Sequence, residues 1–258
     1  MIKDDFNELD KALDLAFQVQ RLLFPPSSPL CTWCCTGVKN RMARKVGGDY
    51  FDFITMPDQC QSLFIGDVTG HGFHAAVIMS LIYGYIHRST LGECAPKEIV
   101  DGVNKFLCTF ARRTQKFDYY FSTTLFFAII DPNSLKMHYV NCGHTPPLAK
   151  QGGKIISLPT SGPPLGFFDD PDIDVLEFKF KPGDRLLLCT DGIIEAKNRQ
   201  GEMYGMQRLR GDLQHGAGDH IEFLDELFGQ LDKFCSGQVN EDDMTAILLD
   251  FNRPFSSY

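Results

Sequence analysis

The sequence predicts an α+β domain in which mostly antiparallel sheets are covered by helices. Three observations support this class. From residue 36 onward, short apolar runs alternate with turn signals rich in Gly, Pro, Asp and Asn. The expected strands come in blocks separated by a pair of expected helices, instead of alternating with single helices. The 258 residues are 43% hydrophobic and 22% charged, which is typical of a globular domain with a sizeable core.

The charge balance and the cysteines narrow the function classes. Lys and Arg number 25 against 33 Asp and Glu, a net charge of −8, so the chain lacks the positive field that binds nucleic acid. The chain starts with the acidic sequence MIKDDFNELD and contains no long apolar run, so we expect neither a secretion signal nor a membrane partner. Nine cysteines, an odd number, without a secretion signal indicate a reducing compartment, so we predict a cytoplasmic protein.

The first 29 residues are predicted to form an amphipathic helix and a Pro-rich connector. Apolar residues recur at helical spacings between residues 4 and 24, and Pro25-Pro26 ends the pattern. The apolar seam is shorter than about three heptads, which favours packing on the chain's own domain over a coiled coil. A homodimer through this helix and docking of a partner both stay open. Residues 30–258 are predicted to form one domain.

Within that domain, apolar runs and turn residues place the elements. Strands are expected over residues 50–55, 61–66, 122–130, 136–141, 175–180, 185–190 and 244–251, each bounded by Gly, Pro, Asp or Asn. Helices are expected over residues 73–87, 96–113 and 219–234. Asp131-Pro132-Asn133 and Gly152-Gly153 are expected to form hairpin turns.

Four acidic clusters lie at the predicted strand boundaries. They read GGDYFD (47–52), GDVTGHG (66–72), TDG (190–192) and EDDMT (241–245). Each alone is typical of a turn or a solvated strand edge. Together, carboxylates presented from several strand ends of one core can converge, and converging carboxylates repel each other unless a cation is present. Oxygen ligands favour magnesium or manganese, and a two-metal centre that activates water suits phosphoester hydrolysis.

A series of motifs resembles a known family. In order they are GGDYFD, IGDVTGHG, STTLFFAIID, YVNCGHTPPL, LLLCTDGIIEA and EDDMTAILL, and they cover about residues 36–251. The series resembles the metal-dependent protein phosphatases of type 2C, and more narrowly the bacterial branch of stage II sporulation protein E and the sigma-factor-regulating phosphatases. The resemblance implies an αββα sandwich of two antiparallel β-sheets flanked by helices. It also implies hydrolysis of phosphoserine or phosphothreonine on an anti-anti-sigma-factor-like protein, dependent on two Mn²⁺ or Mg²⁺ ions.

The resemblance also implies roles for individual residues. Asp67 matches the ligand that bridges the two metals, and Val68 matches the residue whose carbonyl oxygen binds one of them. Asp191 and Asp242 match the remaining ligands of the first metal. Asp49 matches the acid near the second metal, which acts directly or through water.

Three further residues have less certain counterparts. Asp52 and Asp243 are expected to accept hydrogen bonds behind the ligands. Some members of the resembled family carry an Asp-Gly-His-Gly motif, whose histidine is thought to act as general acid. In this chain Thr69, not histidine, follows Asp67-Val68. His71 is the candidate that could protonate the leaving oxygen instead, and a cap on the following helix is its alternative role.

Two other functions remain as alternatives. Residues 70–75, GHGFHA, satisfy a short dinucleotide-binding pattern, but a second helix and not a parallel strand is expected to follow. A catalytically silent phosphatase-like module that only binds a partner is the stronger alternative. The four intact acidic clusters argue against it.

Overall fold

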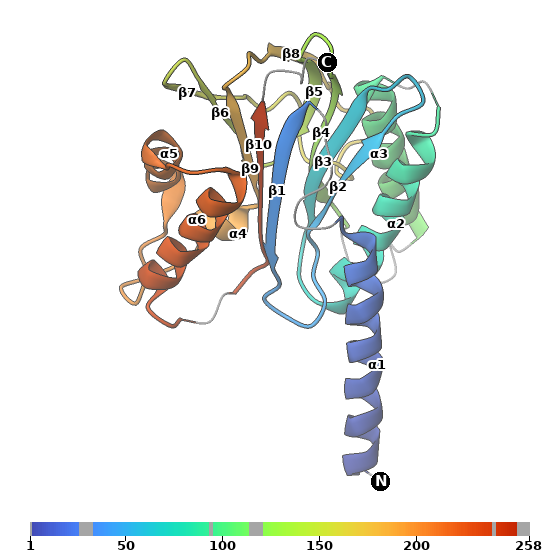
Figure 1. Cartoon of the computed structure of the whole chain (residues 1–258). Helices are drawn as coiled ribbons and strands as arrows, with labels where there is room; N and C mark the ends of the chain where they lie inside the picture. Colours follow the sequence, from blue (N-terminus) through green and yellow to red (C-terminus); the bar gives the residue numbers. More distant parts are fainter. Residues whose placement is uncertain (1, 26–32, 93–94, 114–120, 239–240, 252–258) are drawn as a thin grey trace.

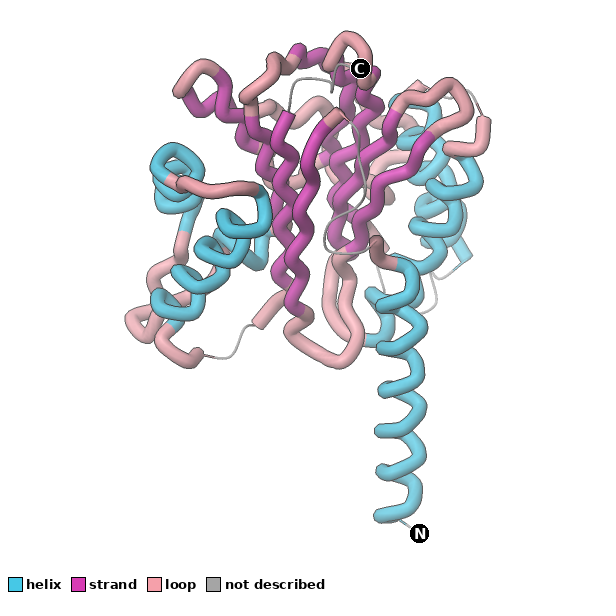
Figure 2. The backbone as a smooth tube through the Cα atoms, viewed as in Figure 1, coloured by secondary structure: helices cyan, strands magenta, loops and turns pink. Residues whose placement is uncertain are grey.

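In the computed structural model the chain forms two five-stranded antiparallel sheets packed face to face, with helices on both outer faces (Figures 1 and 2). The structure describes residues 2–25, 33–92, 95–113, 121–238 and 241–251. One sheet has the order β1 (Cys34–Arg41), β10 (Met244–Phe251), β9 (Arg185–Cys189), β6 (Leu148–Gln151) and β7 (Lys154–Ser157). The other has the order β2 (Tyr50–Thr55), β3 (Gln61–Val68), β4 (Thr123–Asp131), β5 (Lys136–Cys142) and β8 (Leu176–Lys179). The predicted αββα sandwich is confirmed.

The helices divide between the two outer faces. Helices α2 (Phe73–Ser89) and α3 (Pro96–Arg113) cover the sheet that contains β3 and β4. Helices α5 (Gly205–His215) and α6 (His220–Cys235) cover the other sheet, and the short α4 (Asp191–Ile194) follows β9. Helix α1 (Ile2–Leu23) projects away from the sandwich (Figure 1). No described helix is both long enough and apolar enough to cross a membrane.

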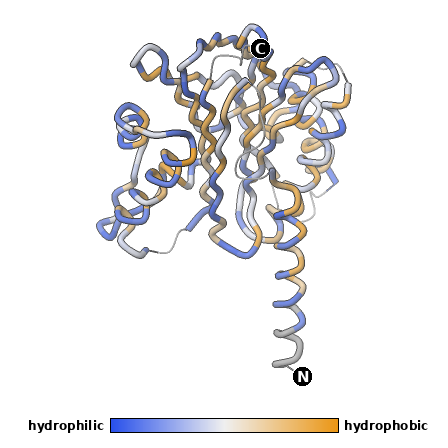
Figure 3. The backbone as a smooth tube through the Cα atoms, in the orientation of Figure 1, coloured by the Kyte–Doolittle hydropathy of each residue, from blue (hydrophilic) through white to orange (hydrophobic). Residues whose placement is uncertain are grey.

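The main core lies between the sheets. Because side chains alternate across a strand, one set from each strand faces the opposite sheet. Phe51, Ile65 and Phe126 face this space from one sheet, and Leu188 and Ile247 face it from the other; none is more than 1% exposed. Burying each such side chain stabilises the fold by about 1.5–3 kcal/mol. Hydrophobic residues accordingly concentrate in the strands in Figure 3, while the peripheral loops are more polar.

Most predicted elements are present, with boundaries within a few residues. The helices expected over residues 4–24, 73–87, 96–113 and 219–234 are α1, α2, α3 and α6. The two predicted hairpin turns join β4 to β5 and β6 to β7, and Gly152 and Gly153 adopt φ angles of 56° and 78°. Strands β1, β6 and β7 and helices α4 and α5 had no counterpart among the predicted elements. Most of the predicted connector after Pro25 lies outside the described residues.

Candidate functional site

The predicted metal ligands come together at one end of the sandwich. Asp49 precedes β2 and Asp67 is the penultimate residue of β3; these strands pair with Tyr50 opposite Gly66, so the two acids are neighbours. Asp191 begins α4 directly after β9, and Asp242 precedes β10. Because β9 and β10 also pair, all four acids emerge at the same end of the two sheets.

The electrostatics of these acids show how closely they approach. The pKa of Asp67 is raised to about 10, by burial first and then by the charges of Asp49, Asp191, Asp242 and Asp243, in that order of effect. The pKa of Asp49 is also raised, by burial first and then by Asp243. Burial and the neighbouring Asp242 raise the pKa of Asp191. The chain therefore concentrates negative charge where solvent screening is weak, an arrangement that a divalent cation stabilises.

Two threonines from the other sheet hold the Asp49 carboxylate. Thr190 Oγ1 donates to Asp49 Oδ2 at 3.0 Å, and Thr245 Oγ1 donates to the same oxygen at 2.5 Å. Both threonines are fully buried, and both bonds lower the pKa of Asp49 against the effect of burial. The carboxylate is thus fixed across the gap between the sheets.

Asp243 fastens the loop that leads to Asp49. Its carboxylate accepts hydrogen bonds from the backbone N–H groups of Ala43 at 2.8 Å and Gly48 at 2.9 Å. A Cβ on Gly47 would lie 1.9 Å from Asp243 Oδ2, so only glycine permits this approach. Asp243 therefore lies behind the other acids as an acceptor for backbone groups.

The predicted backbone ligand faces the same space as Asp67. A Cβ on Gly48 would lie 2.9 Å from Asp67 Oδ1 and 3.0 Å from the Val68 carbonyl oxygen. Both oxygens therefore face the small space in front of Gly48, and this all-oxygen donor set fits a magnesium or manganese ion. Across the described residues, no three His, Cys, Asp or Glu side chains are grouped tightly enough to enclose an ion, so the acids share a space without forming a complete coordination set.

Asp52 does not belong to this group, and its predicted support of the ligands was wrong. It follows Asp49 by three positions, an odd number, so its side chain points to the opposite face of the sheet. There Asp52 Oδ2 accepts hydrogen bonds from Tyr83 Oη at 2.5 Å and from His87 Nε2 at 2.7 Å. The Tyr83 hydroxyl also contacts the carbonyl oxygen of Leu23, which ties the end of α1 to α2.

His71 lies exposed on the short loop between Val68 and α2. The neighbouring Gly70 and Gly72 adopt φ angles of 93° and 77°, conformations that glycine supplies without strain. Gly72 is the N-cap of α2 and no side chain caps it, so the alternative role of His71 as a helix cap is not seen. Arg44 Nη2 lies 3.4 Å from His71 Nε2.

The structure adds a buried histidine that the site prediction did not include. His144 is 2% exposed, and its Nδ1 lies 3.0 Å from Thr124 Oγ1, opposite Asp67 in the β3–β4 pair. Burial lowers the pKa of His144 to about 3, and the Cys189 carbonyl partly opposes this shift. Among the described side chains, buried His144 Nε2 and Asn141 Nδ2 have no hydrogen-bond partner. The sequence signal for both was the Asn-Cys-Gly-His motif.

A two-sheet antiparallel sandwich with helices on both outer faces is the PP2C-type fold. The chain belongs to the stage II sporulation protein E (SpoIIE) family, whose profile matches residues 57–252. The family resemblance of the motifs is therefore confirmed.

Individual relatives agree with this assignment. Protein IcfG of Synechocystis sp. is 29% identical over 270 residues, which are 95% of this chain and 42% of the relative. Phosphoserine phosphatase RsbU of Bacillus subtilis is 24% identical over 249 residues, 94% of this chain and 70% of the relative. The chain thus spans less than half of the first relative and more than two thirds of the second. The SiaA-PP2C domain of Pseudomonas aeruginosa superposes with a TM-score of 0.83 at 18% identity, covering 96% of this chain and 99% of that domain, and shares the fold.

Proposed function

We propose that this chain is a Mn²⁺- or Mg²⁺-dependent protein phosphatase that removes phosphate from serine or threonine of a partner protein. The observation that carries the proposal is the gathering of carboxylates around Asp67, whose pKa is raised to about 10. Gathered carboxylates repel one another when ionised, divalent cations offset this repulsion, and such cations would supply the activated water and the charge stabilisation that phosphoester hydrolysis uses. Relatives named phosphoserine phosphatase support the same reaction.

Each residue has a defined task in this proposal. Asp67 would be shared by two ions, and the Val68 carbonyl would bind one of them. Asp191 and Asp242 would bind the first ion, and Asp49 would serve the second directly or through water. When bound, such ions supply activated water at neutral pH and offset charge on the phosphoryl group.

The remaining buried groups keep this site in shape. Thr190 and Thr245 orient the Asp49 carboxylate, and Asp243 holds the loop that carries it. No covalent intermediate with a protein side chain is part of the proposal.

His71 is the proposed proton donor to the leaving oxygen. Its support is its position, four residues after Asp67 on an exposed loop at the edge of the site.

The proposed substrate is an anti-anti-sigma-factor-like phosphoprotein in the cytoplasm, supported by family membership and by the resemblance to sigma-factor-regulating phosphatases.

We further propose a homodimer through α1. Leu15, Val19 and Leu22 recur at helical spacing and are 62%, 54% and 84% exposed, so α1 presents an uncovered apolar stripe. Light scattering tests the dimer: Leu22→Asp should yield monomers, and a wild-type monomer at all concentrations would contradict it.

The test of the activity is Asp67→Asn. This change removes a charge shared by two ions, so we expect loss of manganese binding in calorimetry together with loss of aryl phosphate hydrolysis. The fold should persist, because relief of carboxylate repulsion offsets the lost ligand. Asp225→Asn is the matched control, since Asp225 is exposed on α6 and pairs with Lys39. Unchanged two-site manganese binding in Asp67→Asn would refute the assignment, and a wild-type protein inactive with manganese would favour the silent binding module.

A further inference from the structure

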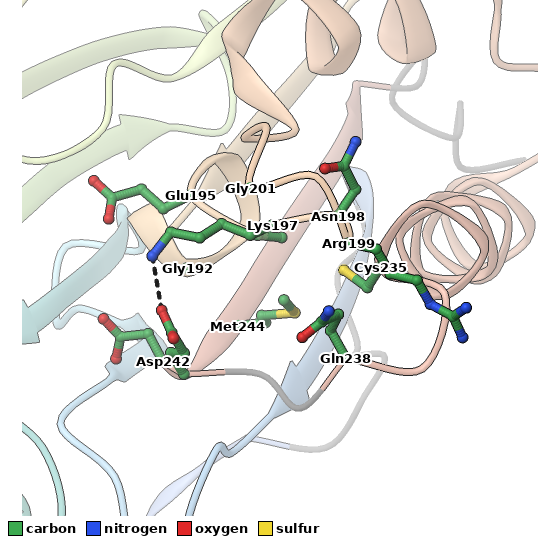
Figure 4. Close-up of a pocket in the computed structure, with 12 residues that line it drawn as sticks. Gly192, Glu195, Lys197, Asn198, Arg199, Gly201, Cys235, Gln238, Asp242 and Met244 are labelled. Atoms are coloured by element: carbon green, nitrogen blue, oxygen red, sulfur yellow. Dashed lines mark hydrogen bonds and ion pairs between the residues drawn. The ribbon is translucent and has the colours of Figure 1, made fainter.

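A cavity of about 350 Å³ opens directly beside the carboxylates (Figure 4). It lies between the segment from α4 to Gly201, the C-terminal end of α6 and the start of β10. Gly192 and Asp242 are part of its wall, so the cavity is continuous with the proposed catalytic site. None of the roles proposed above uses this space.

The lining combines an apolar floor with a polar mouth. Ala196, Cys235 and Met244 line the cavity and are 7%, 6% and 2% exposed, so they form its buried floor. The two sulfur-containing side chains are polarisable and adapt to the shape of an apolar group. In Figure 4, Glu195 and Lys197 lie on the side of Asp242, whereas Arg199 and Gln238 lie on the opposite side.

The cations at the mouth already have partners within the chain. Lys197 Nζ lies 2.8 Å from Glu241 Oε2, and Arg199 Nη2 donates to the Ser236 carbonyl at 3.1 Å. An acidic side chain that entered would compete with Glu241 for Lys197, and a basic one would compete with Lys197 for Glu241. The Lys197–Glu241 pair is balanced in charge, so it offers no unpaired charge to a ligand of either sign, and an uncharged side chain enters without competing for it.

One wall of the cavity is preformed by a tight hairpin. Lys197 and Met203 pair across it, and Asn198 Oδ1 accepts hydrogen bonds from the N–H groups of Gln200 at 3.0 Å and Glu202 at 2.9 Å. A wall held by its own hydrogen bonds needs no ordering when a ligand enters, which favours binding.

We propose that this cavity receives an uncharged aliphatic side chain that flanks the phosphorylated residue of the protein substrate. The inference rests on the proposed phosphatase function. Consecutive Cα atoms are about 3.8 Å apart, so a phosphoserine bound at the metal site that includes Asp242 would place its chain neighbours beside the cavity mouth. Ligand pockets begin at about 300 Å³, so the volume admits one side chain with part of its backbone. The cavity would make the enzyme selective for sequence next to the phosphate.

The experiment measures phosphate release from synthetic phosphoserine peptides in the presence of manganese. An alanine-based host peptide carries Leu, Glu or Lys at each flanking position in turn, and an aryl phosphate is the reference substrate. We expect Leu at one position to raise kcat/KM by about tenfold or more over Ala, while Glu and Lys give no gain. The quantity compared between variants is the ratio of kcat/KM for the Leu peptide to that for the aryl phosphate.

Gln238→Trp is the decisive variant. Gln238 is exposed on the cavity rim, so an indole there should fill the cavity without disturbing the core, and the Leu advantage should disappear. Gln200→Trp is the matched control, because Gln200 is exposed on the hairpin and does not line the cavity. Hydrolysis of the aryl phosphate without any Leu advantage, or an advantage that survives Gln238→Trp, overturns this inference alone. A wild-type protein that hydrolyses neither substrate overturns the phosphatase proposal as well.

Discussion

The buried His144 should make the stability of this domain depend on pH in a predictable way. The side chain is almost completely buried, its Nδ1 lies 3.0 Å from the Thr124 hydroxyl, and among the described residues its Nε2 has no hydrogen-bond partner. Burial lowers the pKa of His144 to about 3, whereas an unfolded histidine titrates near about 6.5. We therefore consider the substitution His144→Gln, which removes the titration and keeps a polar group near Thr124.

The direction and size of the effect follow from proton linkage. Because the pKa is lower in the folded state, the unfolded chain binds more protons as pH falls below about 6.5, and the free energy of unfolding decreases. The slope approaches about 1.4 kcal/mol per pH unit, and the loss between pH 7 and pH 5 is about 2 kcal/mol. The raised pKa values of Asp49 and Asp67 act in the opposite direction, since protonation then favours the folded state.

The assay is urea unfolding of wild type and His144→Gln at pH 7, 6 and 5, with a chelator present so that metal binding does not contribute. The carboxylates are common to both proteins, so their contribution cancels in the difference. We expect the variant to lose about 2 kcal/mol less than wild type between pH 7 and 5. His138→Gln is the control, because His138 is exposed on β5. Parallel pH dependence of wild type and His144→Gln would refute the assignment of a buried neutral imidazole.

Three further changes test other parts of the account. His71→Ala should slow release of phosphate from phosphoserine by about 10²-fold or more and hardly affect an aryl phosphate, whose leaving group needs no proton; equal losses would indicate a structural role. Gly192→Ala should destabilise the domain by about 1–3 kcal/mol in urea, because its Cβ would lie 2.0 Å from the Asp243 carbonyl, whereas Gly211→Ala in open space should not. Deletion of residues 1–24 breaks the Leu23–Tyr83 contact and should shift the manganese concentration for half-maximal activity by about 5- to 150-fold, with less effect on the rate at saturating metal. Lower stability with unchanged metal dependence would show that α1 contributes only to the packing of the core.

The sequence predicted the main elements because their apolar periodicity is strong, and it missed those whose residues lack it. Strand β1 reads CCTGVKNR and pairs only with β10 at the sheet edge, so its last residues are polar. Strands β6 and β7 have four residues each, too few to display a period. Helix α5 begins with Gly205 and contains Gly211, and both residues weaken a helical pattern.

The motifs predicted the acids of the site, but not the contacts that hold these acids in place. Thr190 and Thr245, which hold Asp49, are 141 and 196 residues from it in sequence, and nothing in their local sequence indicates this contact. Asp52 was placed wrongly because it is close to Asp49 in the chain, although an odd separation along a strand puts two side chains on opposite faces.

The same alternation explains why the acids gather where they do. On six strands, the position two residues beyond the last inter-sheet core residue carries a polar side chain, and all of these face the same end of the gap between the sheets. They are Asp49 beyond Phe51, Asp67 beyond Ile65, Thr124 beyond Phe126, Asn141 beyond Tyr139, Thr190 beyond Leu188 and Thr245 beyond Ile247. The apolar core therefore ends in a layer of carboxyl, hydroxyl and amide groups that both sheets hold rigidly. The raised pKa of Asp67 is thus a property of the whole end of the sandwich, because the surrounding core excludes the water that would otherwise solvate these charges.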